Sequence, residues 1–374
     1  MSVEKKHINI FDIFRGVAIF SIFLSHLNFW NETNMAGVYY WVSYARLAVD
    51  FFFILSGFLL AYGMDRKILK GKEYRDFIIK KIKKFYPLYI ATLLIGIIWY
   101  WYRHYSEVGV VKDFIIRLLV SLPLLQSLVP IGNIPNSFNG VFWFLSCTFV
   151  LYLISPLLLR INEKIKQSIK YIIIAFGLNI VVWGLLYTFF QYLQYNLLSD
   201  YNLSLVYSTS YIRVFYYISG ILCYDFFSVS FQYVEEKFAR HFTFIESSVC
   251  LITILWWLVA DNGFFKVIFQ ELINVLILTA GIYIFAFERG KCSRWFTKMK
   301  IKKLGSISYE FFMIHYLVID IGIYIFGELW GNTEILSIAY AIIFFIISVI
   351  LSEIAHKNWG IPLKSKTKII KKMG

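Results

Sequence analysis

The chain alternates long apolar runs with short polar segments over most of its 374 residues. A run of about 20 apolar residues is long enough for an α-helix to cross the hydrocarbon core of a bilayer. The pattern therefore predicts an all-α polytopic membrane protein with about ten transmembrane helices. The runs lie at residues 8–29, 42–62, 86–102, 141–159, 171–190, 211–227, 246–260, 267–287, 307–326 and 335–354.

One more apolar run, at 114–128, is shorter and contains Arg117 and Pro123. A run of that size is typical of a re-entrant or interfacial helix. If it does not cross, most of the 37 Lys and Arg residues fall on one side of the membrane, as cytoplasmic loops require. We therefore expect cytoplasmic termini, one membrane-embedded domain over 1–356 and a basic cytoplasmic tail over 357–374.

The composition fits this class of protein. The chain is 59% hydrophobic and 16% charged, whereas soluble domains average about 45–50% apolar and about 25% charged residues. The net charge of +14 follows from the basic cytoplasmic segments, so we expect the lipid bilayer as a partner and no nucleic acid. The cysteines have no paired spacing, and no metal site is expected.

The first run carries three ionisable side chains, Asp12, Arg15 and His26. An ionisable residue inside a membrane is a functional-site hypothesis by default. Arg15 and His26 lie on one helix face, about 16 Å apart along its axis, and Asp12 is one turn before Arg15, in position to pair with it. The alternative is that Arg15 is an interfacial anchor and His26 a packed histidine.

The second run contains Asp50 and Ser56. Asp50 lies at a depth similar to that of His26 in the first run. It is therefore expected either to orient and charge-stabilise the His26 imidazole or to neutralise Arg46 in an i,i+4 pair.

The segment 63–85 is the most basic part of the chain and includes Lys80, Lys81 and Lys84. Lysine binds phosphate as a point charge. The segment is therefore either an ordinary cytoplasmic loop or a cradle for a polyanionic cofactor.

Polar residues also mark a late span and two outer loops. Ser308 and His315 share one helix face of the run 307–326, and His315 is expected either to pack or to line a cavity near the middle of the membrane. The loops 131–140 and 191–210 are rich in amides, hydroxyls and aromatic rings. This composition suits a sugar, and equally a solvated loop beside an aromatic belt.

Five short motifs occur in a fixed order along the chain. They are FDIFRGVA at 11–18 followed by His26, AVDFFFILSGF at 48–58, KKIKKFYPLY at 80–89, WFLS at 143–146, and ISY at 307–309 ahead of His315. Together they resemble the acyltransferase-3 family of membrane acyltransferases. The chain departs from the family pattern in two places: the basic run is all Lys where many members have Arg, and no acidic residue follows WFLS.

The resemblance implies transfer of an acyl group, most often acetyl, from cytoplasmic acyl-CoA (acetyl-CoA or another) to a hydroxyl of an extracytoplasmic glycan, such as a surface or exopolysaccharide. It implies that His26 and Asp50 are catalytic. It implies a cofactor-binding set comprising Arg15, Lys80, Lys81, Lys84 and Tyr86. It also implies a substrate or cavity-lining set comprising Asp12, Ser56, Trp143, Ser146, Ser308 and His315.

Several alternatives stay open at this point. His26 acts either as a general base or as a nucleophile that carries the acyl group. An exporter of polysaccharide or of an acylated precursor also places charges inside a membrane, although the chain lacks the repeated halves of many transporters. A non-catalytic scaffold is a further rival. We expect a multi-pass protein of a bacterial inner membrane, and its oligomeric state, including a homo-oligomer, stays open.

Overall fold

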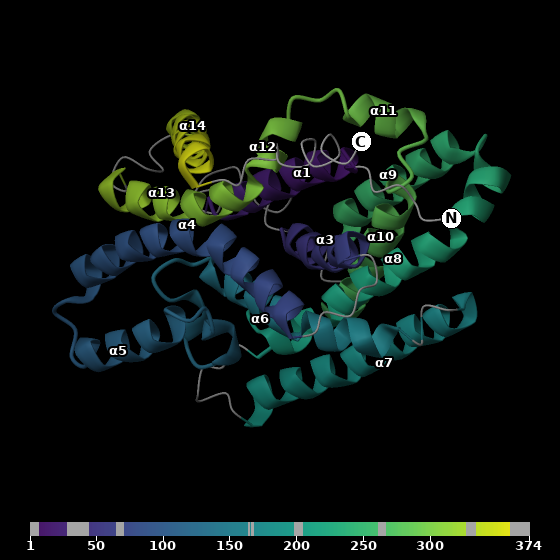
Figure 1. Cartoon of the computed structure of the whole chain (residues 1–374). Coiled ribbons are helices and arrows are strands. Elements are labelled where there is room, and N and C mark those ends of the chain that lie inside the picture. The colour runs from purple at the N-terminus through teal and green to yellow at the C-terminus, as the bar shows by residue number, and fades with distance from the viewer. Residues whose placement is uncertain are drawn as a thin grey trace, which may run out of the picture.

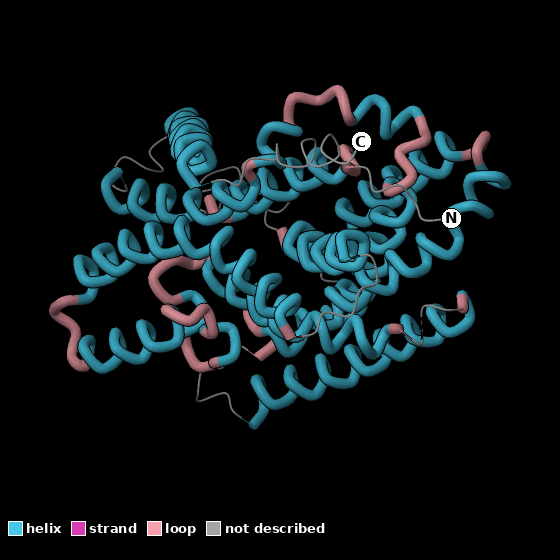
Figure 2. Tube along the Cα trace, in the orientation of Figure 1, coloured by secondary structure: helices cyan, strands magenta, loops and turns pink. Residues whose placement is uncertain are grey.

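The computed structural model describes residues 7–27, 45–64, 71–163, 165, 168–197, 205–260, 267–326 and 334–359. Every regular element in these residues is helical (Figure 2). The ends of the predicted first and second spans, at 28–29 and 42–44, lie outside the described residues, as does 360–374 of the expected basic tail.

The long helices follow the predicted apolar runs (Figure 1). In chain order they are α1 (Ile10–Ser25), α3 (Arg46–Met64), α4 (Lys72–His104), α6 (Phe142–Asn162), α7 (Ile169–Tyr192), α8 (Ser210–Phe238), α9 (Phe242–Ala260), α10 (Val267–Phe285), α13 (Ser308–Phe326) and α14 (Glu334–Trp359). Shorter elements are α5 (Val110–Ser121), α11 (Lys291–Phe296), α12 (Lys302–Ser306), the 3₁₀ turns η2 (Gln126–Leu128) and η3 (Ile134–Asn136), and the π-turn η4 (Leu193–Leu197).

The expected membrane class is confirmed by these helices. In the described part of the chain, 9 helices are long and apolar enough to cross a membrane. The remaining predicted span, 8–29, corresponds to α1, whose described helix has 16 residues. The chain is therefore an all-α polytopic protein.

The short run at 114–128 does not form a spanning helix. Helix α5 has 12 residues and lies beside the end of α4, with which it forms a hairpin (Figure 1). A left-handed Leu124, with φ of 59°, then turns the chain into η2. The expected non-spanning segment is thus confirmed, although its helix begins at Val110 and ends at Ser121.

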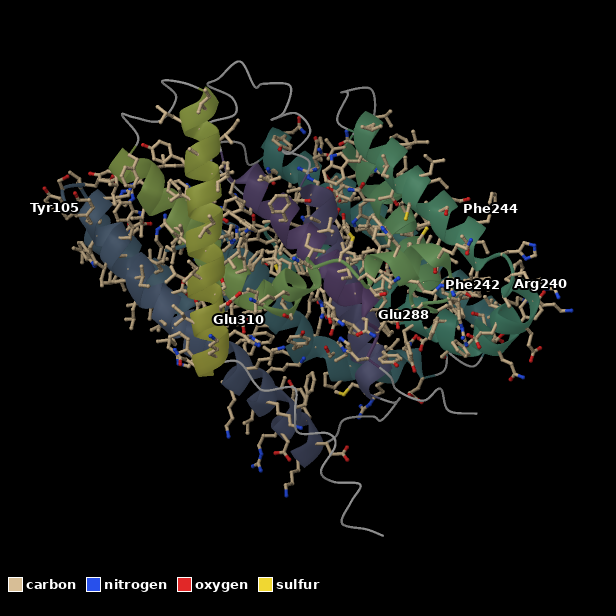
Figure 3. All side chains as sticks on the ribbon, turned by 90° about the horizontal axis from the view of Figure 1, so that it is seen from above. Tyr105, Arg240, Phe242, Phe244, Glu288 and Glu310 are labelled. Atoms are coloured by element: carbon tan, nitrogen blue, oxygen red, sulfur yellow. The ribbon has the colours of Figure 1, made fainter. Side chains whose placement is uncertain are left out.

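Helix α4 differs from the sequence expectation. Its 33 residues extend over about 50 Å, which exceeds the ~30 Å hydrocarbon core. The basic residues expected in a loop therefore form the first turns of this helix, because lysine is a good helix former. Figure 3 shows this end of α4 projecting beyond the other helices, with nitrogen-tipped side chains.

Small residues bring the central helices together. A Cβ on Gly57 of α3 would meet the Tyr217 backbone of α8, and one on Gly220 of α8 would meet the Ile54 backbone of α3. Close backbone approach of this kind is how helices associate within lipid, where the hydrophobic effect adds little. The α3–α8 crossing is therefore fixed by two glycines.

Replacing Gly220 by Leu tests this crossing. The added side chain would force two backbones apart, so we expect a loss of about 1–3 kcal/mol or more in stability, measured as a lower melting temperature in detergent. Gly184→Leu in α7 is the matched control, since its Cβ meets open space. Equal melting temperatures for the two variants would contradict the proposed packing.

Candidate active site

Helix α1 lies among α12, α13 and α3 (Figure 1). Its first turn is tied down by Glu288, whose Oε1 accepts a hydrogen bond of 2.9 Å from the Ile10 amide. Arg15 lies near this end of α1 and lines one cavity. His26 follows the other end and lines a second cavity, so one helix carries both predicted residues to separate sites.

The first cavity, here called the Arg15 cavity, has a volume of about 540 Å³. The expected pair is present, with Arg15 Nη1 3.1 Å from Asp12 Oδ1. His7 lies 2.7 Å from the other Asp12 oxygen, and this hydrogen bond raises the pKa of His7 above its usual value. Tyr152 lines the same cavity. His7 and Arg15 therefore both contact the Asp12 carboxylate, and Lys84 lines the same cavity.

Four other residues of the predicted sets can be placed against this cavity. Ser56 and Ser308 line it, as does Lys84. Lys81 is not a lining residue, but its Nζ lies 3.8 Å from the ring centroid of Tyr152. Tyr152 itself lines the cavity. On the far wall, His356 Nδ1 is 2.9 Å from Glu310 Oε1, and Figure 3 shows Glu310 beside α14.

Lys80 and Tyr86 are not among the residues that line the Arg15 cavity. Lys80 is exposed, and the Tyr86 hydroxyl donates a hydrogen bond of 3.4 Å to the Leu122 carbonyl. Residues 80–89 lie within helix α4 and not in a loop. Only one face of a helix can reach a given cavity, so Lys80 and Tyr86 point elsewhere when Lys84 lines it. The placement does not support these two residues as cofactor ligands.

The second cavity, here called the His26 cavity, has a volume of about 580 Å³. The His26 ring packs edge to face against Tyr316, with centroids 5.1 Å apart. The remaining wall combines aromatic rings, amides and charged groups. Its members include Trp99, Tyr100, Trp143, Tyr207, Asn133, Asn136, Asn139, Arg103, His104, Glu107, Asp113, Arg117 and Asp320.

Helix α5 and the loop after it form part of this wall. Arg117 is 2.5 Å from Asp113 and donates to the Asn133 carbonyl at 3.1 Å. Ser146, predicted to line the substrate cavity, instead holds the loop: its hydroxyl lies 2.8 Å from the Leu124 carbonyl and 2.8 Å from Ser127 Oγ. Because Ser146 is fully buried in these bonds, its role here is support and the prediction of a lining residue is not met.

Asp50 is hydrogen-bonded to two residues that were not expected from the sequence. Its oxygens accept hydrogen bonds from Arg213 at 2.6 Å and from Asn274 at 3.1 Å. Arg46 pairs with Glu271 at 3.0 Å. The expected contacts of Asp50 with His26 and with Arg46 were therefore wrong, because the true partners come from α8 and α10, far away along the chain.

The buried pair still supports the His26 cavity. The guanidinium of Arg213 lies 5.7 Å from the ring centroid of Trp143 and 5.0 Å from that of Tyr207. Both rings line the cavity, as was expected of Trp143. Asp50 thus binds the Arg213 guanidinium, which packs against these two rings of the cavity wall.

Two aromatic residues stand between the cavities. Phe312 of α13 lines both of them, and its ring centroid is 4.7 Å from that of Phe144 in α6. His315, one turn further along α13, is buried next to His26, with 5.5 Å between ring centroids. The contact between Phe312 and Phe144 was not predicted from the sequence, because aromatic residues are common among the apolar runs.

No cluster of three or more His, Cys, Asp or Glu side chains suited to a metal ion occurs in the described ranges. The residues that the sequence singled out in the first span, Arg15 and His26, supply a guanidinium and an imidazole at the two ends of α1.

Comparison with known proteins identifies the class. A sequence model of the acyltransferase-3 family, described as an acyltransferase domain, matches residues 8–356. The chain belongs to this family and is a membrane acyltransferase. This assignment does not support the exporter and scaffold alternatives, neither of which has catalytic activity.

Individual relatives agree with the family. Acyltransferase MdmB of Streptomyces mycarofaciens is 32% identical over 155 residues, which are 41% of this chain and 38% of that protein. Putative acetyltransferase ORF330 of Acidianus two-tailed virus is 25% identical over 273 residues, 73% of this chain and 72% of that protein. Protein 2 in the picA locus of Rhizobium radiobacter is 26% identical over 165 residues, 42% of this chain and 78% of that protein. The match with MdmB thus spans well under half of its length, and no solved structure matches the chain.

Removing one member of the buried Asp50–Arg213 pair tests its role. Asp50→Leu leaves an uncompensated guanidinium, and we expect a loss of about 3–5 kcal/mol in stability, measured by thermal unfolding in detergent. Adding Arg213→Met should recover much of this loss, because both charges are then gone.

Glu235→Leu, which breaks an exposed pair with Arg289, is the control and should cost about 0–1 kcal/mol. A stable Asp50→Leu protein that has lost only activity would restore the catalytic role predicted from the sequence.

Proposed function

We propose that this acyltransferase moves an acyl group, most simply acetyl, from acyl-CoA on the cytoplasmic side to a hydroxyl of a glycan on the other side. The observation that carries the proposal is the placement of Arg15 and His26 in separate cavities at the two ends of α1. The basic segments favour a cytoplasmic location for both termini and for the Arg15 cavity.

The Arg15 cavity suits the polyanionic end of acyl-CoA. Arg15 and Lys84 supply positive charge, and charge-assisted bonds to phosphate are roughly twice as strong as neutral ones. Asp12 holds the Arg15 guanidinium in place at 3.1 Å. The basic start of α4 extends the positive surface beyond the cavity, which favours approach of an anionic donor.

The His26 cavity suits a sugar. Amide groups both donate and accept hydrogen bonds, as sugar hydroxyls require, and Asn133, Asn136 and Asn139 supply them. Aromatic rings such as Trp143 offer flat apolar faces for the sugar ring. A surface or exopolysaccharide unit is the acceptor class that we propose.

The acyl group would cross between the cavities where Phe312 and Phe144 meet. Arg15 and His26 are about 16 Å apart along the helix, a span that the extended pantetheine arm of CoA can bridge. The thioester would then reach His26 while the phosphates stay near Arg15. Opening this passage requires the two rings to separate.

Two routes complete the transfer. In one, a His26 nitrogen takes the proton of the sugar hydroxyl, the oxygen attacks the thioester carbon, the carbon–sulfur bond breaks, and the thiolate receives the proton. In the other, a His26 nitrogen attacks the thioester carbon and the CoA thiolate leaves. The sugar hydroxyl then takes the acyl group from His26, and its proton ends on the thiolate. Both routes need a His26 nitrogen with a free lone pair facing the cavity.

We further propose a single membrane-embedded domain over 1–356 with a basic cytoplasmic tail, placed in the inner membrane of a bacterium. The basic segments support this orientation.

Replacing His26 tests the proposal in cells. In a strain that makes its own surface polysaccharide, wild type should add ester-linked acetate to the polymer, seen by NMR. His26→Ala at equal membrane level should lose it, because general bases contribute about 10²- to 10⁴-fold in rate. His241→Ala, at an exposed histidine, is the control, and undiminished acetate with His26→Ala would refute the role of His26.

A matched pair on α4 tests the donor site. Lys84 lines the Arg15 cavity and Lys80 does not. Lys84→Ala should raise the KM for acetyl-CoA about tenfold or more, through loss of a charge-assisted phosphate contact, while kcat changes little. Lys80→Ala should leave both constants near wild type. Equal changes in KM for the two variants would contradict the placement of the donor site in the Arg15 cavity.

A further inference from the structure

His315 has a fixed proton position. It is fully buried on α13, and its Nδ1 lies 2.9 Å from the Phe311 carbonyl oxygen. A carbonyl oxygen only accepts hydrogen bonds, so Nδ1 must carry the proton. The other ring nitrogen, Nε2, is therefore left as an acceptor with a free lone pair.

This Nε2 atom is buried and has no hydrogen-bond partner within the described ranges. Leaving a buried polar atom unsatisfied is costly, and such atoms in native proteins call for an explanation. The aromatic neighbours of the His315 ring are Phe23, Phe311, Phe312 and His26. Of these four rings, His26 alone has an N–H group to donate.

The spacing of the two imidazoles is suitable for such a bond. Their centroids are 5.5 Å apart, with the planes tilted by 41°. A hydrogen bond of about 3 Å plus the radii of two five-membered rings gives nearly this separation. Rotation of the His26 ring, which lies just beyond the last residue of α1, can align the bond.

We propose that His315 is a positioning residue that accepts a hydrogen bond from His26 and so selects its tautomer. The proposal rests on the proposed function of His26. With one His26 nitrogen donating to His315 Nε2, the other is left unprotonated and faces the cavity. That is the nitrogen which either route of transfer requires.

The same bond stabilises the charged intermediate state of the ring. When the cavity-facing nitrogen takes the hydroxyl proton, or the acyl group, His26 becomes cationic. Its remaining N–H is then a stronger donor, and hydrogen bonds to charged groups are worth more than neutral ones. His315 is thus expected to act on kcat and not on substrate binding.

The test compares His315→Gln, whose side-chain carbonyl can accept a bond near the position of Nε2, with His315→Leu, which cannot. Purified proteins in detergent receive labelled acetyl-CoA and the simple glycoside to which wild type transfers acetate fastest. His315→Leu should lower kcat about 10- to 100-fold and change KM for acetyl-CoA less than about threefold. His315→Gln should restore most of the lost kcat.

Several results would overturn the proposal. An undiminished kcat in His315→Leu would do so, as would equal losses in the Leu and Gln variants or a loss confined to KM. If the Leu variant does not accumulate, His315→Met, an apolar replacement that packs adaptably, takes its place. His26→Ala with wild-type kcat, or a wild type that transfers acetate to no glycoside, would instead refute the proposed function itself.

Discussion

Ionisable side chains between apolar helices must be paired or hydrogen-bonded, and this constraint connects most parts of the molecule. Asp50 joins α3 to α8 and α10 through Arg213 and Asn274. Glu246 joins α9 to the start of α11 by accepting bonds from Gly290 and Ser293. Glu288 holds the first turn of α1. Asp50 and Glu288 thus hold α3 and α1, which line the two cavities, and Glu246 holds α9 against α11.

This arrangement leaves two ionisable groups of α1 with roles beyond pairing. Arg15 keeps one carboxylate partner but also lines a cavity, and His26 lines the other cavity beside a second buried histidine. Between the two cavities lies Phe312, which lines both of them and packs against Phe144. A membrane acyltransferase needs such a division, because a thioester that meets water before the acceptor would be hydrolysed.

The apolar runs predicted the spanning helices because hydropathy is a local property. The Arg15–His26 spacing predicted their placement near opposite ends of α1, because that placement depends on one helix alone. The basic start of α4 was missed as a helix, since hydropathy does not separate a lysine-rich loop from a lysine-rich helix. The partner of Asp50 was missed because Arg213 is 163 positions away. Ser146 likewise supports a loop whose path depends on tertiary contacts with η2.

The central claim is that donor and acceptor approach α1 from opposite faces of the membrane, and the most direct measurement is the sidedness of transfer. Sealed inside-out and right-side-out vesicles would receive membrane-impermeant labelled acetyl-CoA outside, with a glycoside acceptor enclosed. We predict acetylated glycoside in the inside-out vesicles, where the cytoplasmic face meets the donor, and none in the right-side-out vesicles. Equal transfer in both, or transfer that requires donor and acceptor on the same side, would contradict the account.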